Sequence, residues 1–239
     1  MTISYLGYFF LFVTCVFWPL RSYRALRKHP IGQPITTPRP KRYAVGIALT
    51  LLQAALALWT AFDNGLPLFG SLRVNVLGIA ATLVFLAITL GTLPWIVRHR
   101  SPGWRMRFFS ILPTTTGERT AWLFICAIVA VSEEIIYRAV TFGLFYKLAG
   151  NYWIAIVLAA AVFALNHLVQ GWISAGTIFI IGLGFHLLVR ITGGLYAAIA
   201  AHFFYDLMAG IVFGRVARKE SEKRAPSGEE TLLPQPLED

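Results

Sequence analysis

Charged residues are scarce in this sequence. Only 13% of its 239 residues are Asp, Glu, Lys or Arg, whereas 57% are hydrophobic, and the mean hydropathy is +0.65. Soluble domains contain about 25% charged residues, so this composition excludes a soluble globular protein. Long uncharged runs recur along the chain, and such runs are typical of transmembrane helices. We therefore predict an all-α, polytopic transmembrane helical bundle.

Cysteine is also rare, and one common metal motif is missing. Cys15 and Cys126 both lie in apolar runs without CxxC spacing, which indicates packing residues rather than redox or metal chemistry. The zinc-protease signature HExxH does not occur. Its absence weakens the case for a catalytic metal without excluding a metal site of another kind.

Acidic residues are few, with 11 Asp and Glu against 21 Lys and Arg, and the net charge is +10. The cations lie mainly in loops between the apolar runs, which is the pattern of membrane topology and not of a nucleic-acid-binding surface. One side of the predicted bundle carries nearly all of them, and the other carries only Arg73, Lys147 and Arg190. The positive-inside rule then predicts an N-terminus outside and a C-terminus in the cytosol.

The apolar runs divide the chain into about seven spans, predicted at 3–20, 43–62, 74–97, 120–148, 152–169, 172–189 and 195–213. Residues 1–20 form the first transmembrane helix. A basic cytosolic loop, 21–42, contains four prolines and is expected to be mostly irregular. Residues 43–119 hold spans two and three with a second basic loop, and 120–214 form the membrane core that carries the candidate site. Residues 215–239 are predicted to be a disordered cytosolic tail.

Two carboxylates and a guanidinium interrupt the fourth span, which carries no charge from Ala121 to Val131. Each such residue costs about 2.5–3.5 kcal/mol at the centre of a membrane helix, so three of them require a reason. Glu134 and Arg138 have the i,i+4 spacing of an ion pair, which predicts a structural role for both. Glu133 points about 100° away from Glu134, on the face that also carries Tyr137, and is free to meet other helices.

The later spans add a few more polar groups. His167 lies in the fifth span, and His202 and Asp206 share one face of the seventh at i,i+4 spacing. A lone polar residue in a span is commonly a packing residue, and we interpret Asn166 and His186 in that way. Glu133, His167, His202 and Asp206, however, have no dedicated cation among them. We predict that they meet in one water-accessible pocket.

A pocket with these groups suits hydrolysis. Glu133 would act as general base on a water, and His167 would hold that water or protonate the leaving amine. His202 would stabilise the tetrahedral oxyanion, with Asp206 fixing its tautomer. The same four residues could instead bind a zinc-type divalent metal as His and carboxylate ligands, so the cofactor stays open between none and such a metal.

Three motifs in this order carry a resemblance: Glu133-Glu134-x-x-x-Arg138, Phe163-x-x-x-His167 and His202-x-x-x-Asp206. They are similar to the motifs of the CPBP family of intramembrane proteases, which includes type II CaaX prenyl endopeptidases and Abi-like bacteriocin-processing proteins. The resemblance covers roughly 121–213 and implies that Glu133 activates water, His167 assists it, and His202 lies on the oxyanion side. The last motif often ends in asparagine, and an ionised aspartate at 206 cannot donate to an oxyanion.

The resemblance implies a CaaX-type endopeptidase, dependent on glutamate or on a metal, in a bacterial inner membrane. Its partners would be the lipid bilayer and a membrane-associated protein or peptide, cut near its end at a CaaX-like, leader or sorting sequence. Nucleic acid is not expected as a partner. The alternative is a non-catalytic protein, either an immunity factor that binds a toxin peptide or a proton-coupled carrier. A carrier typically has paired interrupted helices in two similar halves, and no such repeat is visible.

Overall fold

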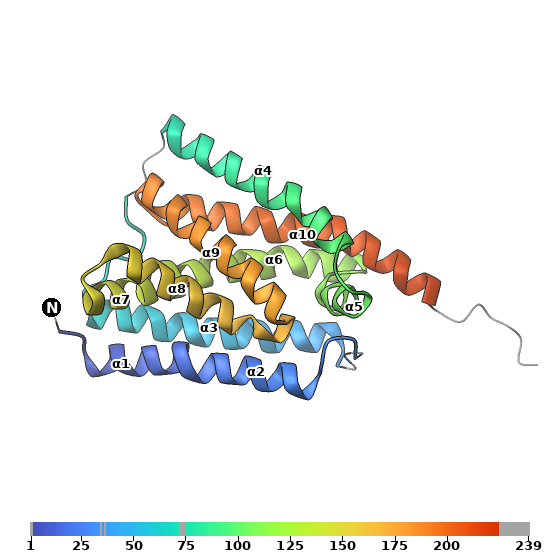
Figure 1. Cartoon of the computed structure of the whole chain (residues 1–239), viewed down its shortest axis with the longest axis horizontal. Coiled ribbons are helices and arrows are strands. Elements are labelled where there is room, and N and C mark those ends of the chain that lie inside the picture. Colours follow the sequence, from blue (N-terminus) through green and yellow to red (C-terminus); the bar gives the residue numbers. More distant parts are fainter. Residues whose placement is uncertain (1, 34, 36, 72–74, 225–239) are drawn as a thin grey trace, which may run out of the picture.

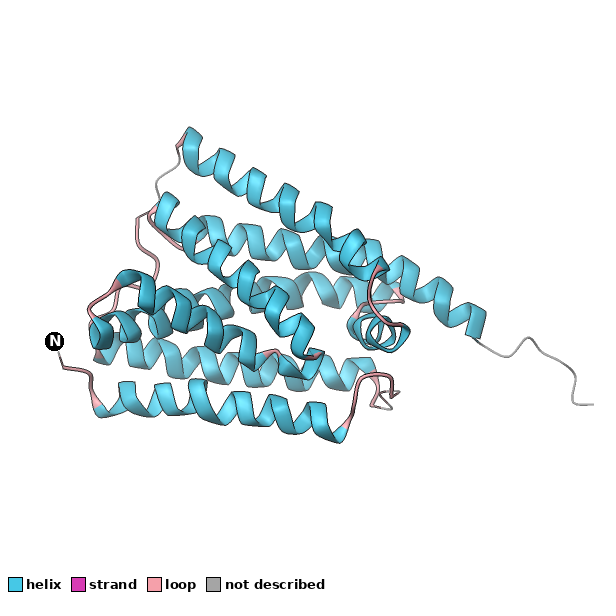
Figure 2. Cartoon of the chain, viewed as in Figure 1, coloured by secondary structure: helices cyan, strands magenta, loops and turns pink. Residues whose placement is uncertain are grey.

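The computed structural model describes residues 2–33, 35, 37–71 and 75–224. Within this part of the chain the structure is helical, and the one β-type pairing is an isolated bridge between Gly70 and Gly194 (Figure 2). The all-α class predicted from the hydropathy pattern is therefore confirmed.

The helices follow the predicted spans closely. Three consecutive segments, α1 (Tyr5–Phe12), η1 (Val13–Phe17) and α2 (Trp18–Lys28), form one continuous first rod. The remaining helices are α3 (Arg39–Asp63), α4 (Val76–Arg98), α5 (Pro102–Ile111), α6 (Thr116–Glu133), η2 (Glu134–Thr141), α7 (Phe142–Ala149), α8 (Tyr152–Asn166), η3 (Leu168–Gln170), α9 (Trp172–Thr192) and α10 (Tyr196–Arg224). The segments α6, η2 and α7 again form one rod, because no loop separates them.

The rods run roughly side by side, with the first rod and α4 at opposite edges of the bundle (Figure 1). The first rod packs on α3, and α4 packs on α9 and α10. Helix α6 contacts both α3 and α10, while α8 lies between α7 and α9. The rod that carries the acidic motif is therefore central to the bundle.

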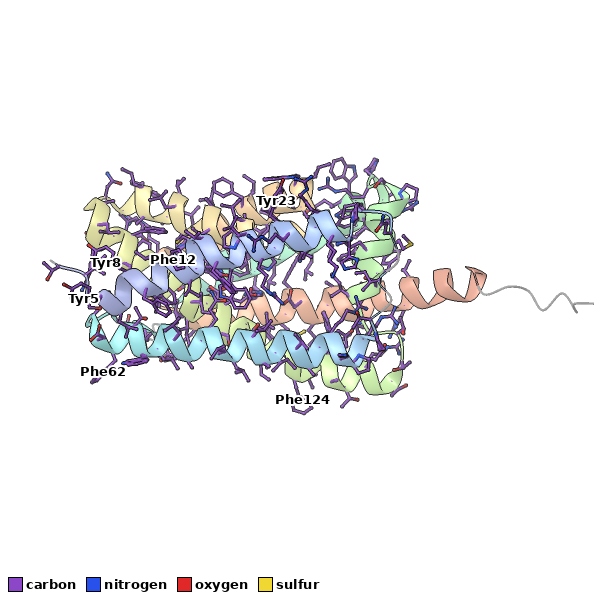
Figure 3. The ribbon with its side chains drawn as sticks, turned by 90° about the horizontal axis from the view of Figure 1, so that it is seen from below. Tyr5, Tyr8, Phe12, Tyr23, Phe62 and Phe124 are labelled. Carbon is purple, nitrogen blue, oxygen red and sulfur yellow. The ribbon has the colours of Figure 1, made fainter. Side chains whose placement is uncertain are left out.

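The outer surface is apolar. Tyr5, Phe62 and Phe124 are 96%, 89% and 63% exposed and point away from the bundle (Figure 3). Five of the described helices are long and apolar enough to cross a membrane. Large exposed apolar side chains on such helices are expected to face lipid. The chain is an integral membrane protein, and a count of seven spans stays a prediction.

The structure corrects three boundaries. The loop at 21–42 is shorter than expected, because the first rod continues to Lys28 and α3 already begins at Arg39, with proline in its first turn. The second basic loop contains α5, whose N-terminus is capped when Ser101 Oγ accepts a hydrogen bond from the Trp104 amide. Helix α10 continues past residue 215 to Arg224, so the predicted tail is partly helical. Its remainder, 225–239, and Arg73 lie outside the described residues.

A backbone contact fixes the start of α10. The Leu195 amide donates to Phe69 O at 2.9 Å, and the Ser71 amide donates to Gly193 O at 3.1 Å. A Cβ atom on Gly194 would lie 2.6 Å from Phe69 O and 2.8 Å from Ser71 O. Because both neighbours are backbone atoms, they cannot move aside as a flexible side chain would.

We therefore expect Gly194→Ala to destabilise the fold by about 1–3 kcal/mol, the range typical of overpacking. Thermal unfolding of the purified protein in detergent would measure the loss. Gly91→Ala in α4 is the matched control, because a Cβ atom at that position meets nothing within 4 Å. Equal unfolding temperatures for the two variants would contradict this account of the turn.

Candidate active site

The acidic motif lies where the central rod changes its winding. Helix α6 begins with a capping box between Thr115 and Glu118 and ends at Glu133. From Glu134 to Thr141 the rod is a π-helix, and every residue of this segment is buried. The Thr141 hydroxyl donates to Ile136 O at 2.7 Å, five residues earlier. Short π-helical segments inside α-helices are frequent at functional sites.

Glu134 is fully buried and has two partners. Its Oε1 lies 3.3 Å from Arg138 Nη1, at the i,i+4 spacing seen in the sequence, and 2.8 Å from His202 Nδ1. The second contact joins the central rod to α10 across 68 sequence positions. The sequence indicated only the local pair with Arg138. In the structure Glu134 also contacts His202 on α10.

Arg138 is held mainly by aromatic rings. Its guanidinium carbon lies 4.2 Å from the ring centre of Phe163 on α8 and 4.9 Å from that of Phe185 on α9. Among the described residues its side-chain nitrogens have no hydrogen-bond partner, although Nη1 faces Glu134. Cation–π contacts of this kind strengthen when they are desolvated. Arg138 therefore connects three helices around one buried charge pair.

Glu133 faces the other candidate residues. Its Oε1 lies 3.9 Å from His167 Nε2, and its Oε2 lies 3.7 Å from His202 Nε2. Both separations exceed ordinary hydrogen-bond lengths, so each pair can be bridged by a water that lies beside the two atoms, in the cavity. The three side chains line one cavity of about 340 Å³, together with Asp206 and apolar residues of α3, α6, α8, α9 and α10.

His167 lies just after α8, at its C-cap, and not inside a span that continues to residue 169. Its Nδ1 is 2.8 Å from Phe163 O, so a proton on Nδ1 is held by that carbonyl and Nε2 is turned towards Glu133. Two hydrogen bonds hold the segment after His167 in place at Val169. The Val169 amide donates to Ser22 Oγ at 2.8 Å, and the Val169 carbonyl accepts from Arg107 Nη1 at 2.9 Å. Neither Ser22 nor Arg107 has a local sequence signal for this role.

His202 and Asp206 both project from α10. His202 Nε2 is 3.5 Å from Asp206 Oδ2, so the aspartate faces this nitrogen and not Nδ1. The expectation that Asp206 fixes the tautomer needs correction, because Glu134 occupies the Nδ1 side. The physical reason is tertiary: the close contact of α6 with α10 brings a carboxylate of another helix to the ring.

The remaining predicted residues have packing contacts. Tyr137 is buried and its hydroxyl accepts a hydrogen bond of 2.9 Å from Asn166 Nδ2. The same amide nitrogen donates to Thr14 O at 3.2 Å, which ties α8 to the first rod. His186 is buried beside Phe142, and among the described residues its Nε2 has no hydrogen-bond partner. These three residues lie outside the lining of the cavity.

A divalent metal is the alternative interpretation of these four residues. The carboxylates and imidazoles of the four candidates include the ligand types that zinc prefers. Within the part of the chain that the structure describes, however, no three His, Cys, Asp or Glu side chains are arranged to hold a metal ion. The cofactor therefore stays open between none and a divalent metal held by these side chains.

The geometry provides an acid–base pair of carboxylate and imidazole groups at a partly enclosed cavity. Glu133 is 17% exposed at its side chain and His167 is 22% exposed, so both can reach a molecule in the cavity. The side chain of His202 is 7% exposed, and Glu134 orients its ring through the contact at Nδ1, on the side away from Glu133. Such an arrangement can remove a proton from water and stabilise negative charge on a nearby carbonyl oxygen.

Comparison with known proteins finds one protein family that matches part of the chain. Residues 115–208 match the model of the family described as type II CAAX prenyl endopeptidase Rce1-like. No curated protein and no solved structure matches the chain. The matched segment contains Glu133, His167, His202 and Asp206. The resemblance seen in the three motifs is thereby confirmed: over residues 115–208, the membrane core of this chain is a match to the Rce1-like type II CAAX prenyl endopeptidases.

Proposed function

We propose that this protein is an intramembrane endopeptidase that hydrolyses a peptide bond near the end of a membrane-associated protein or peptide. The family match implies a protease with a membrane-associated peptide substrate. The observation that carries the assignment of roles is the position of the Glu133 carboxylate, 3.9 Å from His167 Nε2 and 3.7 Å from His202 Nε2 at one cavity.

In the first step, a water in the cavity contacts both Glu133 and His167 from one side. Glu133 accepts one proton of this water, and His167 Nε2 accepts a hydrogen bond from the other, because Nδ1 is turned to Phe163 O. The water oxygen attacks the scissile carbonyl carbon, and the carbonyl becomes an oxyanion. Proton removal by a positioned side chain contributes about 10²–10⁴-fold to such a reaction.

His202 stabilises the oxyanion in the second step. With Nδ1 donating to Glu134, a doubly protonated ring presents Nε2–H to the cavity, where Asp206 Oδ2 lies 3.5 Å away. The oxyanion of the substrate then accepts the hydrogen bond from Nε2–H. When the intermediate collapses, the carbon–nitrogen bond breaks and Glu133 returns its proton to the leaving amine. In these two steps every proton taken from water or given to the leaving amine is accounted for by Glu133, without a metal.

We infer the orientation from the distribution of cations. The basic residues between the first rod and α3, those between α4 and α6, and those at the end of α10 share one side of the bundle, which the positive-inside rule assigns to the cytosol. The N-terminus is then outside, and a bacterial inner membrane is the proposed location. The substrate reaches the cavity from the cytosolic half of the bundle, where α3 and α5 border it.

Replacement of the proposed base tests the function. We expect Glu133→Gln to lower peptide hydrolysis by more than about 10²-fold, because an amide cannot accept the proton of water. Unfolding temperature should change little, since Glu133 is no partner of Arg138. Comparative peptidomics of cells that produce the wild type or the variant would reveal the accumulating precursor.

Asp63→Asn is the matched control, because it also removes one carboxylate but lies exposed at the end of α3. Unchanged peptide profiles in the Glu133→Gln cells would contradict the protease assignment and favour a non-catalytic membrane protein.

Glu134 is expected to position His202 as well as to neutralise Arg138. Glu134→Gln should destabilise the protein by about 3–5 kcal/mol, because the guanidinium stays buried without its counter-charge. Adding Arg138→Met removes that charge and should restore much of the unfolding temperature. Hydrolysis should stay at least about 10²-fold below wild type in both variants, because His202 Nδ1 still lacks its carboxylate. Recovery of activity together with stability would assign Glu134 a structural role alone.

Metal removal separates the two mechanisms that the motifs allow. With Glu133 as base and His202 as the oxyanion donor, incubation with EDTA or 1,10-phenanthroline should leave the rate within about twofold of the untreated enzyme. Initial rates on a fluorogenic peptide before and after dialysis against chelator provide the measurement. A loss of activity that added Zn²⁺ restores would replace this mechanism by a metal-dependent one.

A further inference from the structure

His167 lies in a turn and not in the body of a helix. Helix α8 ends one residue before it, η3 covers only Leu168–Gln170, and Gly171 then has a φ of 97°. Two contacts direct the ring: Nδ1 lies 2.8 Å from Phe163 O, and Nε2 lies 3.9 Å from Glu133 Oε1. Backbone groups at a helix end lack partners within the helix. The place of Nε2 at the cavity therefore depends on what else binds this turn.

Two side chains from other segments bind the turn at Val169. Its amide donates to Ser22 Oγ on α2 at 2.8 Å, and its carbonyl accepts from Arg107 Nη1 on α5 at 2.9 Å. This carbonyl belongs to the same planar peptide unit as the Gln170 amide, which donates to His167 O at 2.9 Å. Arg107 thus holds one rigid peptide unit whose other end is hydrogen-bonded to His167 itself.

Arg107 is anchored on its other side by the end of the first rod. Its Nη2 donates to His29 O and to Pro30 O, the second at 3.0 Å. The residue is 4% exposed, and among the described residues no carboxylate forms an ion pair with it. A buried charge without a counter-charge is costly, which favours a role beyond packing. The guanidinium presents its donors in a rigid fork, and this fork fixes the turn after His167 against the first rod.

Helix α5 holds the same turn at a second point. Trp104 lies three residues before Arg107, on the same face of α5. Trp104 Nε1 donates to Ser174 Oγ at 2.6 Å, and the Ser174 hydroxyl donates to Gln170 O at 2.9 Å. Two successive carbonyls are therefore tied to α5, that of Val169 directly and that of Gln170 through Ser174.

We propose that Arg107 is a positioning residue for His167: it holds the turn after α8 so that Nε2 of the ring and the Glu133 carboxylate can contact one water. This inference rests on the proposed endopeptidase function. Arg107 lies outside the matched segment 115–208 and outside the lining of the cavity, so neither the motifs nor the pocket indicate it. A displacement of about 1 Å at a catalytic group can cost about 10²-fold in rate. Loss of the Arg107 contact therefore slows the chemical step and leaves substrate binding almost unchanged.

Kinetics of Arg107 variants in nanodiscs test this inference. The probe is a synthetic peptide that spans the cleavage site of the precursor that accumulates in the Glu133→Gln cells. For Arg107→Gln we expect kcat to fall about 10–100-fold, with KM within about threefold of the wild type, because the contact serves the chemical step. Arg107→Lys should recover part of the loss, since an ammonium keeps the charge but has no planar fork to span separate carbonyls.

A double-mutant cycle separates positioning from a general loss of structure. Single-turnover rates, with enzyme in excess over peptide, are measured for the wild type, Arg107→Gln, His167→Ala and the double variant. Adding Arg107→Gln to His167→Ala should lower the rate by less than about twofold further, because no ring is left to position. A general loosening of the bundle would instead lower the rate by the same factor in both backgrounds.

Milder changes repeat the cycle if Arg107→Gln lowers the amount of folded protein. Arg107→Lys keeps the charge, and Ser22→Ala removes only the acceptor of the Val169 amide. For Ser22→Ala we expect kcat to fall about 3–10-fold, the effect of one hydrogen bond, and only while His167 is present.

Arg105→Gln is the matched control, because it removes another arginine of α5 that lies outside the cavity lining and is no hydrogen-bond partner of Val169. It should keep the wild-type kcat. Wild-type kcat in Arg107→Gln, or equal losses with and without the His167 ring, would overturn the role of Arg107 and leave the protease assignment intact. If no precursor accumulates in the Glu133→Gln cells, the proposed function fails and this inference fails with it.

Discussion

One buried carboxylate, that of Glu134, organises the membrane core. Taking this charge out of water is expensive, and Arg138 and His202 offset part of the cost at one oxygen, Oε1, whereas Oε2 is buried without a hydrogen-bond partner among the described residues. Arg138 in turn lies between the rings of Phe163 and Phe185, so the pair joins the central rod to α8 and α9. His202 adds α10. The contacts of Glu134 that join these helices therefore also orient a proposed catalytic ring. A substitution of Glu134 is expected to change both stability and activity.

The π-helical segment explains how two adjacent acids serve different partners. Glu133 closes α6 and reaches the cavity, whereas Glu134 opens η2 and is fully buried. A π-helix has i→i+5 hydrogen bonds in place of the i→i+4 bonds of an α-helix and is rare, occurring mostly as a short insertion in an α-helix. Here the whole segment from Glu134 to Thr141 is buried, and the Thr141 hydroxyl adds a hydrogen bond to Ile136 O. The unusual winding is thus supported by the neighbouring helices.

The fold class could be predicted from hydropathy. In lipid the backbone polar groups must be paired within the segment, which favours long apolar helices, and most charged residues of this chain lie between its apolar runs. Local spacing also placed Glu134 against Arg138, since i,i+4 neighbours share a helical face. The partner of His202 Nδ1 could not be predicted in this way, because it depends on how α6 packs on α10 across 68 positions. The same holds for Arg107, which fixes the segment after His167 through Val169 O. The order of the motifs indicates which residues share the site. The packing of the helices determines which of their atoms are in contact.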